Sequence, residues 1–245
     1  MAERAAHTAG ELLLGRFGGP ARGVGPKSSP TDLVSDADRA AEAAISELLR
    51  DERPGDGLLS EEGAERASAS GRRWVVDPLD GTTNFLYGYP AWSVSVALED
   101  DGGTAVAVVH DPARGETFRA RRGQGCELNG TRVQVRAPRL LETALIATGF
   151  AYDPGLRALQ ADTLCRLLPK VRDVRRAGSA ALDLAWLAAG RLDGYYERGL
   201  SPWDWAAGRL LVTEAGGALA ELRGEPPGLV AASGELLDRL AGALA

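Results

Sequence analysis

Residues 74–85 read Trp-Val-Val-Asp-Pro-Leu-Asp-Gly-Thr-Thr-Asn-Phe, an apolar run that passes directly into two acids, a proline and a glycine. The apolar residues predict a buried strand, and a carboxylate at the end of a strand is fixed by its scaffold. Gly81 permits close approach of the backbone, and Gly81-Thr82-Thr83 could open a short helix whose N–H groups would hold phosphate oxygens. The segment is therefore suited to bind a cation and a phosphate together.

Three other interpretations of this segment have to be compared with that one. An isolated Asp-x-x-Asp-Gly is also typical of an Asx turn in which Asp77 and Asp80 only cap a loop. A calcium EF-hand loop starting at Asp77 would need Gly and Glu where Thr82 and Gly88 stand, so that motif is excluded. Phosphatases that form an aspartyl-phosphate typically carry Asp-x-Asp-Gly-Thr, whereas these acids are three residues apart, so that class stays a minor alternative.

The pattern outside this segment predicts two kinds of lobe. Helices are expected near residues 2–14 and 37–50, with a Gly- and Pro-rich loop at 17–30 between them. Alternating strands follow, with a tight hairpin at Asn129-Gly130. After residue 138 strands and helices alternate, including a helix with Ser201 as N-cap and Pro202 at its first position. The order indicates stacked layers of helix and sheet in two lobes, residues 1–138 and 139–245.

The composition bounds the function. The 245 residues are 44% hydrophobic and 25% charged, as in an ordinary globular chain, and the net charge of −6 argues against nucleic acid as the main partner. Acidic and basic residues interrupt the first fifteen positions, and no apolar stretch reaches about 18 residues, so a cytoplasmic protein without a membrane partner is expected. Cys126 and Cys165 fit neither a disulfide framework nor a zinc site, and both are interpreted as buried thiols.

Two further acidic segments are candidates for the same site. Glu61 and Glu62 follow a short apolar strand, although paired glutamates on their own are usually solvated. Asp204 lies in the first turn of a predicted helix, where the helix dipole alone favours an acid. The flanking Trp203 and Trp205 indicate partial burial, and a partly buried carboxylate needs a partner such as a metal.

Together these segments resemble the inositol monophosphatase family from Lys27 to about Gly217. The family's metal-site signature is similar to residues 77–82, its Gly-Glu-Glu element to residues 60–62, and its Trp-Asp-x-Ala element to residues 203–208. Residues 27–38 resemble its lysine loop, and residues 178–181 with 195–197 give a fifth match. Ser60 stands where glycine is usual, which touches only backbone freedom.

The resemblance implies a layered αβαβα sandwich with an antiparallel N-terminal sheet and a mixed C-terminal sheet. It also implies two or three Mg²⁺ ions per active site, and oxygen ligands suit that ion. Thr82, hydrogen-bonded to Asp38, would act with Glu61 to orient and deprotonate a water that attacks directly. The implied metal ligands are Glu61, Asp77, the Leu79 carbonyl, Asp80 and Asp204. The implied substrate contacts are Gly81, Thr82 and Thr83 to the phosphate and Gly178, Ser179, Ala180 and Glu197 to the alcohol. Lys27 and Asp32 would assist a third metal or a mobile loop.

The expected activity is hydrolysis of inositol 1-phosphate or a similar polyol phosphate. Fructose 1,6-bisphosphate, histidinol phosphate and 3′-phosphonucleotides remain alternative substrates, and a metal- or phosphate-dependent regulatory protein without turnover is an alternative of another class. The resemblance further implies a homodimer and inhibition by Li⁺.

Several residues also have an ordinary structural interpretation. Residues 195–197 could form a half-buried edge strand. The helical spacing of Asp183 and Trp186 indicates packing and solvation. Arg175 and Arg176 are interpreted as a solvated strand end, with contact to a second phosphate as the alternative. His7 and His110 are not expected to form a ligand set.

Overall fold

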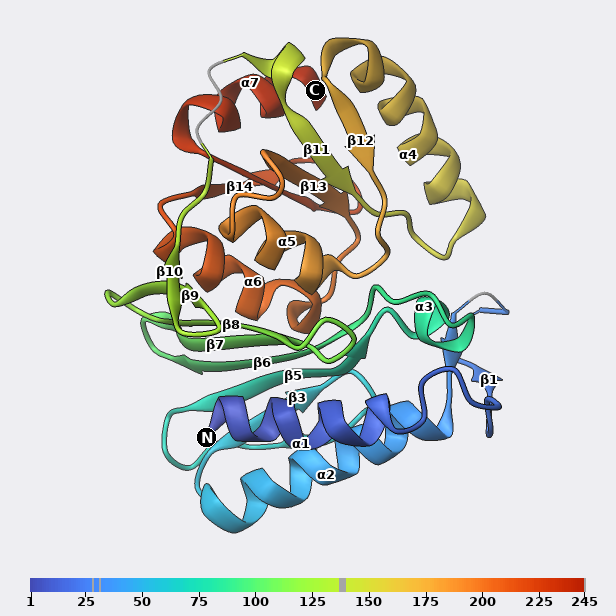
Figure 1. The fold of residues 1–245 in the computed structure, drawn as a ribbon, viewed down its shortest axis with the longest axis vertical. Coiled ribbons are helices and arrows are strands. Elements are labelled where there is room, and N and C mark those ends of the chain that lie inside the picture. The colour runs from blue at the N-terminus through green and yellow to red at the C-terminus, as the bar shows by residue number, and fades with distance from the viewer. Residues whose placement is uncertain (28, 31, 137–139, 245) are drawn as a thin grey trace.

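The computed structural model describes residues 1–27, 29–30, 32–136 and 140–244, and they form five alternating layers of helix and sheet (Figure 1). Two helices cover one face of an eight-stranded sheet, two more lie between this sheet and a five-stranded sheet, and the last two cover the outer face. This confirms the predicted αβαβα sandwich. The helices are α1 (Ala2–Leu14), α2 (Asp36–Glu52), α3 (Thr82–Leu86), α4 (Pro154–Leu167), α5 (Ala180–Ala188), α6 (Pro202–Glu214) and α7 (Gly234–Leu244), with 3-10 turns at Leu141–Thr143 and Leu168–Lys170.

The eight-stranded sheet is antiparallel except for one pair. Its order is β10 (Thr131–Val133), β9 (Gly125–Leu128), β8 (Glu116–Arg121), β7 (Gly103–Asp111), β6 (Ser93–Asp100), β5 (Arg73–Asp80), β3 (Gly57–Ser60) and β4 (Glu65–Arg66). β3 and β5 run parallel, with Ser60 opposite Val76. Because parallel strands end at the same edge, the acids that follow β3 and those at the end of β5 are brought together.

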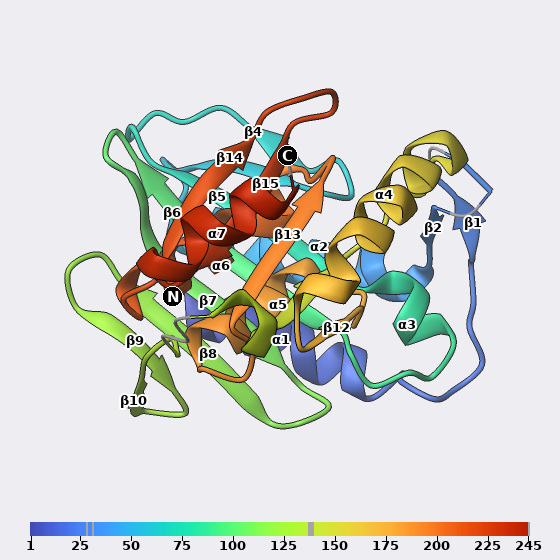
Figure 2. The same cartoon turned by 90° about the horizontal axis from the view of Figure 1, so that it is seen from above.

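The five-stranded sheet is mixed, as expected. Its order is β12 (Asp173–Arg175), β11 (Leu145–Thr148), β13 (Gly194–Arg198), β15 (Gly228–Ala232) and β14 (Ala218–Leu222). β12, β11 and β13 run parallel to one another, and β15 pairs antiparallel with both β13 and β14. Seen from above, α7 lies over this sheet (Figure 2). A third, two-stranded sheet pairs β1 (Gly25–Pro26) with β2 (Leu33–Val34), so the segment 17–30 is not entirely the loop that was expected.

Apolar spacing explains why each helix lies where it does. On α1 the buried positions recur every three or four residues, from Ala2 to Leu13, and α2 begins at a capping box made by Ser35 and Asp38. α5 is buried along almost its whole length, as a helix between two sheets must be. The core around α5 and α6 joins the inner faces of both sheets, from Val75 to Ala231.

Two sequence-based expectations concern the burial of the cysteines and the boundary between the lobes. Cys126 is buried in the central core, but Cys165 is exposed, so the expectation that both are buried was wrong for Cys165; it lies on α4, an outer helix of low amphipathicity. The predicted lobe boundary falls at residues 137–139, which lie outside the described residues, and that division stays a prediction. Within the described part of the chain, no helix combines the length and apolarity needed to cross a membrane.

Candidate active site

The end of β5 places two acids in the interior. Asp77 and Asp80 are 1% and 8% exposed, and the pairing of β5 with β6 becomes irregular between them. The backbone N–H of Leu79 donates to Asp77 Oδ1 at 3.0 Å, so the Asx turn considered from the sequence is present. This bond uses Asp77 Oδ1, and the Asp77 carboxyl group also interacts with the side chain of Glu61.

Asp80 joins the end of β5 to the start of α5. Its Oδ2 accepts hydrogen bonds from the Ser179 hydroxyl at 2.6 Å and from the backbone N–H of Ala181 at 2.7 Å, both at the start of α5. Burial nevertheless raises the pKa of Asp80 to about 6, because these bonds only partly offset the loss of solvation. The acid is thus held rigidly between the two halves of the molecule.

The turn after β5 is built for close backbone packing. Gly81 has φ of +98°, and a Cβ at this position would lie 2.9 Å from the Ala91 carbonyl oxygen, so glycine is required there. α3 begins at the next residue. The first backbone N–H groups of a helix have no partner inside it, so those of Thr82 and Thr83 are suited to bind an anion.

The predicted hydrogen bond between Thr82 and Asp38 is present. Thr82 Oγ1 donates to Asp38 Oδ1 at 2.7 Å, and both side chains are buried. Asp38 Oδ2 accepts from the Ser35 backbone N–H at 2.9 Å, which fixes the carboxylate at the start of α2. Since the hydroxyl proton is directed to Asp38, the lone pairs of Thr82 Oγ1 remain available to accept a hydrogen bond.

Lys27 bridges the paired glutamates. Its Nζ lies 2.9 Å from Glu61 Oε1 and forms a second ion pair with Glu62. The side chain of Glu62 is only 6% exposed, and burial raises its pKa to about 7 despite Lys27. Glu61 and Glu62 are therefore not a solvated pair, as isolated glutamates usually are. Glu62 belongs to this cluster, although no role was predicted for it from the sequence.

Asp204 approaches from the second half of the chain. It lies in the first turn of α6, where its Oδ2 accepts from the backbone N–H of Ser201 at 2.7 Å. Asp204 thus completes a capping box with Ser201, in addition to the favourable position in the helix dipole expected from the sequence. Burial, followed by repulsion from Asp80, raises the pKa of Asp204 well above its usual range.

These groups line one cavity of about 380 Å³ between the two sheets. Thirteen of the sequence-predicted site residues lie on its wall, whereas Asp38 stands behind Thr82 and Thr83 is one position further along α3. The thirteen are Lys27, Asp32, Glu61, Asp77, Leu79, Asp80, Gly81, Thr82, Gly178, Ser179, Ala180, Glu197 and Asp204. Segments far apart in the sequence are therefore brought together as expected.

Buried negative charge dominates this cavity. Burial raises the pKa of Asp77 well above its usual range, and Glu61, Asp80 and Asp204 raise it further. Among the described residues no three acidic, histidine or cysteine side chains are already drawn together as a closed metal site, and Glu61 is engaged by Lys27. The donors are nonetheless all oxygen and their charge is poorly balanced, which fits a hard cation such as Mg²⁺.

Comparison with known proteins assigns the whole chain. The model of the inositol monophosphatase family matches residues 1–244. The chain belongs to this family. An inositol-1-monophosphatase from Rhizobium meliloti is 45% identical over 90% of the chain and 84% of its own length, and Nus factor SuhB from Escherichia coli is 43% identical over 91% and 85%. Family membership supports a phosphatase.

Solved structures of the family have the same fold. The extragenic suppressor protein SuhB from Bartonella henselae superposes with a TM-score of 0.93 at 40% identity, covering 99% of this chain and 96% of its own. An inositol monophosphatase from Anabaena gives a TM-score of 0.86 at 37% identity, covering 99% and 93%. The inositol monophosphatase fold thus accounts for the layers seen in Figure 1.

In this family member the cavity wall also includes residues that the sequence analysis had given only a structural role. Arg176 lies on its wall with the guanidinium 6.0 Å from the Phe150 ring centre. It is exposed and directly follows the end of β12, as the solvated strand end expected from the sequence implies. Asp183 is 1% exposed, and burial raises its pKa well above the usual range, so the expected packing is present but the expected solvation was wrong. The loop from Gly149 to Tyr152 completes this side, and no sequence motif marks it.

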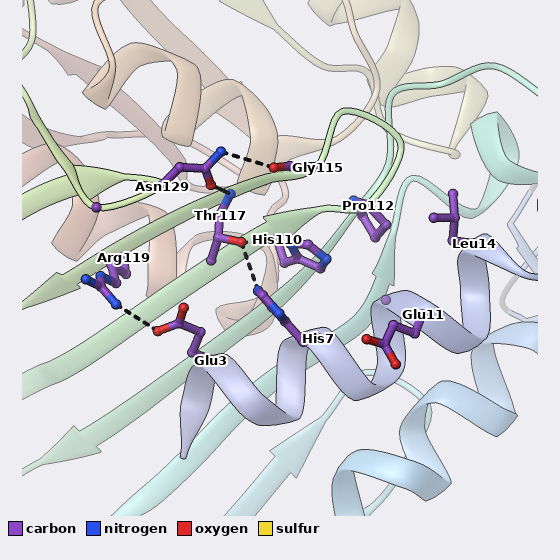
Figure 3. A pocket seen from close by; sticks show the side chains of 12 residues that line it. Glu3, His7, Glu11, Leu14, His110, Pro112, Gly115, Thr117, Arg119 and Asn129 are labelled. Atoms are coloured by element: carbon purple, nitrogen blue, oxygen red, sulfur yellow. Dashed lines mark hydrogen bonds and ion pairs between the residues drawn. The ribbon is translucent and has the colours of Figure 1, made fainter.

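A second hollow of about 550 Å³ lies between α1 and the eight-stranded sheet (Figure 3). The rings of His7 and His110 stack there with centroids 4.3 Å apart. The Thr117 hydroxyl lies 2.9 Å from His7 Nε2 and 3.0 Å from His110 Nδ1, and Glu3 pairs with Arg119 at 3.0 Å. These polar groups engage one another, so this hollow is the weaker candidate for the inositol monophosphatase site.

Proposed function

We propose that this protein is a Mg²⁺-dependent phosphomonoesterase that hydrolyses inositol 1-phosphate or a similar polyol phosphate. The observation that carries the proposal is the cavity where buried, poorly compensated carboxylates meet the first turn of α3 and the Thr82–Asp38 hydrogen bond. Membership of the inositol monophosphatase family supports the same activity.

The carboxylates would hold two or three metal ions. Glu61, Asp77, Asp80 and Asp204, with the Leu79 carbonyl, supply oxygen donors from β5, the turn after β3 and the start of α6. When bound, Mg²⁺ supplies positive charge to the phosphate oxygens and lowers the pKa of a water molecule. Asp32 and Lys27 lie at the same wall, and we propose that they assist a further ion or the loop that carries them.

Thr82 and Glu61 would prepare the attacking water. Because Thr82 Oγ1 donates its hydrogen bond to Asp38, the same oxygen can accept a hydrogen bond from the water and so orient it. Glu61 would take its proton, and Lys27 Nζ holds the Glu61 carboxylate in place at 2.9 Å. Attack is direct, with no covalent enzyme intermediate.

The substrate would bind across the cavity. Backbone N–H groups of Gly81, Thr82 and Thr83 would hold phosphate oxygens at the start of α3. The alcohol part would face Gly178, Ser179, Ala180 and Glu197 on the opposite wall, formed by α5 and β13. A carboxylate accepts hydrogen bonds from neighbouring hydroxyls, so Glu197 favours a polyol such as inositol.

The first test is phosphate release from a panel of these phosphomonoesters, with Mg²⁺ and with a chelator. Asp77→Asn is expected to lower kcat/KM at least about 100-fold, because it removes a charged metal donor while keeping the shape of the side chain. Asp238→Asn, on the exposed face of α7, is the matched control and should behave as wild type. Wild type without turnover on any ester in Mg²⁺ would refute the enzymatic proposal.

A second candidate function comes from relatives named Nus factor SuhB, 43% identical to this chain. If the protein is a Nus factor, it should restore Nus-factor function to Escherichia coli lacking SuhB, and Asp77→Asn should restore it equally well. Failure of both to do so would remove this candidate.

We also propose a homodimer, inhibition by Li⁺ and a cytoplasmic location, with neither nucleic acid nor membrane as main partner. The first two follow from the family resemblance, and the expectation about nucleic acid follows from the net charge of −6. A monomeric native mass, or activity unaffected by Li⁺, would contradict the first two.

A further inference from the structure

Glu197 has a hydrogen-bond partner on its own strand. Residues two apart on a strand face the same side, so Tyr195 and Glu197 both lie on the face of β13 that meets α5. The Tyr195 hydroxyl donates to Glu197 Oε2 at 2.7 Å. One oxygen of the Glu197 carboxylate is thus already hydrogen-bonded within the protein before any ligand binds.

Tyr195 is itself immobile. Its side chain has no exposed area and packs in the core between the two sheets. Burial, and then the charge of Glu197, raises the pKa of the Tyr195 phenol well above its usual range, so the phenol keeps its proton and acts as the donor. A short bond from a buried phenol therefore fixes the position of the carboxylate.

Gly149 supports Glu197 from the neighbouring strand. It follows β11, whose last residue Thr148 is opposite Tyr196 in the parallel pair with β13. A Cβ on Gly149 would lie 2.0 Å from Glu197 Oε2 and 2.2 Å from its Cδ, far inside van der Waals contact. The carboxylate therefore rests directly against the backbone of Gly149, and any side chain at this position would displace it.

A glutamate side chain has several rotatable bonds, and ordering it when a ligand binds costs conformational entropy. Here the phenol and the glycine order it in advance. We infer that Tyr195 and Gly149 are positioning residues that hold the Glu197 carboxylate ready for substrate hydroxyls and so set the preference for a polyol phosphate. This inference rests on the proposed function and adds the residues that determine its specificity.

The test compares kcat/KM for inositol 1-phosphate with kcat/KM for p-nitrophenyl phosphate, whose alcohol part carries no hydroxyls. Tyr195→Phe removes only the donor, and we expect it to lower the ratio of the two values about tenfold, the size of one hydrogen bond to a charged group. The loss should come from a higher KM for inositol 1-phosphate, while kcat for p-nitrophenyl phosphate stays unchanged. Tyr196→Phe, buried on the opposite face of β13, is the matched control.

Three further variants separate positioning from a general structural role. Gly149→Ala should lower the same ratio through its clash with the carboxylate. Adding Tyr195→Phe to Glu197→Ala should lower the ratio no further than Glu197→Ala alone, because no carboxylate is left to position. Equal losses on both substrates in Tyr195→Phe and Gly149→Ala would show a structural role only and overturn the inference.

The wild type distinguishes the two levels of the proposal. If it prefers inositol 1-phosphate and both variants keep the wild-type ratio, the positioning inference is wrong and the proposed function stands. If it hydrolyses both esters without preference, or neither, the proposed polyol substrate is wrong and the inference falls with it.

Discussion

Thr82 concentrates the proposed chemistry in one hydroxyl group. Thr82→Val keeps the shape of the side chain and removes the oxygen that would orient the water. We expect kcat to fall at least about 100-fold with little change in KM, the loss typical of a group that acts in proton transfer. Thr213→Val, which removes an exposed hydroxyl bonded only within α6, is the matched control. Unchanged kcat in Thr82→Val would remove Thr82 from the mechanism.

Single residues were predictable where local chemistry marks them. Acids beside a buried strand, as at Asp77 and Asp80, are held in place by local structure and mark a candidate site, although an Asx turn was also predicted there and is present. Lys27 and Asp183 could not be predicted in the same way. Lys27 meets Glu61 across 34 positions of sequence, and Asp183 has the spacing of any helical residue; only the placement of α5 between two sheets buries it at the cavity.

The junction of β5 with α3 is an element that tolerates little change. Gly81 and Gly88 flank α3, and both have positive φ, of +98° and +69°. A Cβ at Gly81 would lie 2.9 Å from a backbone oxygen, whereas a Cβ at Gly88 would meet nothing within 4 Å. In urea unfolding, the free energy of unfolding of Gly81→Ala and of Gly88→Ala should fall by about 1–2 kcal/mol, because alanine disfavours the left-handed backbone conformation. The fall should be larger for Gly81→Ala because its Cβ also clashes with a backbone oxygen.

Equal losses in the two variants would contradict that assignment of the clash. The activity of Gly81→Ala should fall as well, since the N–H groups that would hold phosphate start at this residue. Gly88→Ala, at the far end of α3, should keep its activity.

Elements with strong periodicity were predicted well, and short ones were not. α1 begins and ends where its apolar spacing indicates, and the hairpin between β9 and β10 turns at Asn129-Gly130. β1, β2 and β4 have two residues each, too few for any alternation to be recognised. The parallel pairing of β3 with β5 depends on contacts between strands, which a local pattern does not carry.

At the scale of the whole molecule, the buried acids should make stability depend on Mg²⁺ and pH together. Folding raises the pKa of Asp77, Asp80 and Asp204, so the unfolded chain releases these protons first. Without metal, the acids therefore lower the stability as pH rises from about 4 through about 6. Mg²⁺ binds the ionised form, so the gain in Tm that it gives should grow over the same range.

At pH 7 we expect a gain of roughly 5–10 °C at a Mg²⁺ concentration 100 times its Kd, measured by thermal unfolding against a chelator. Asp77→Asn should reduce the gain. Burial lowers the pKa of His110 to about 4, which makes stability rise with pH over part of this range, but it contributes alike with and without Mg²⁺ and cancels in the difference. A gain independent of pH would contradict this account.

The order of the layers has a consequence for the growing chain. Synthesis proceeds from the N-terminus, and α1 and α2 are made before the strands whose outer face they cover. The other face of the eight-stranded sheet is covered by α5 and α6. These helices lie between Ala180 and Glu214, whereas the last strand of the sheet, β10, ends at Val133. While the ribosome adds these residues, an apolar sheet face waits uncovered, so this is the interval in which the nascent protein most needs a chaperone.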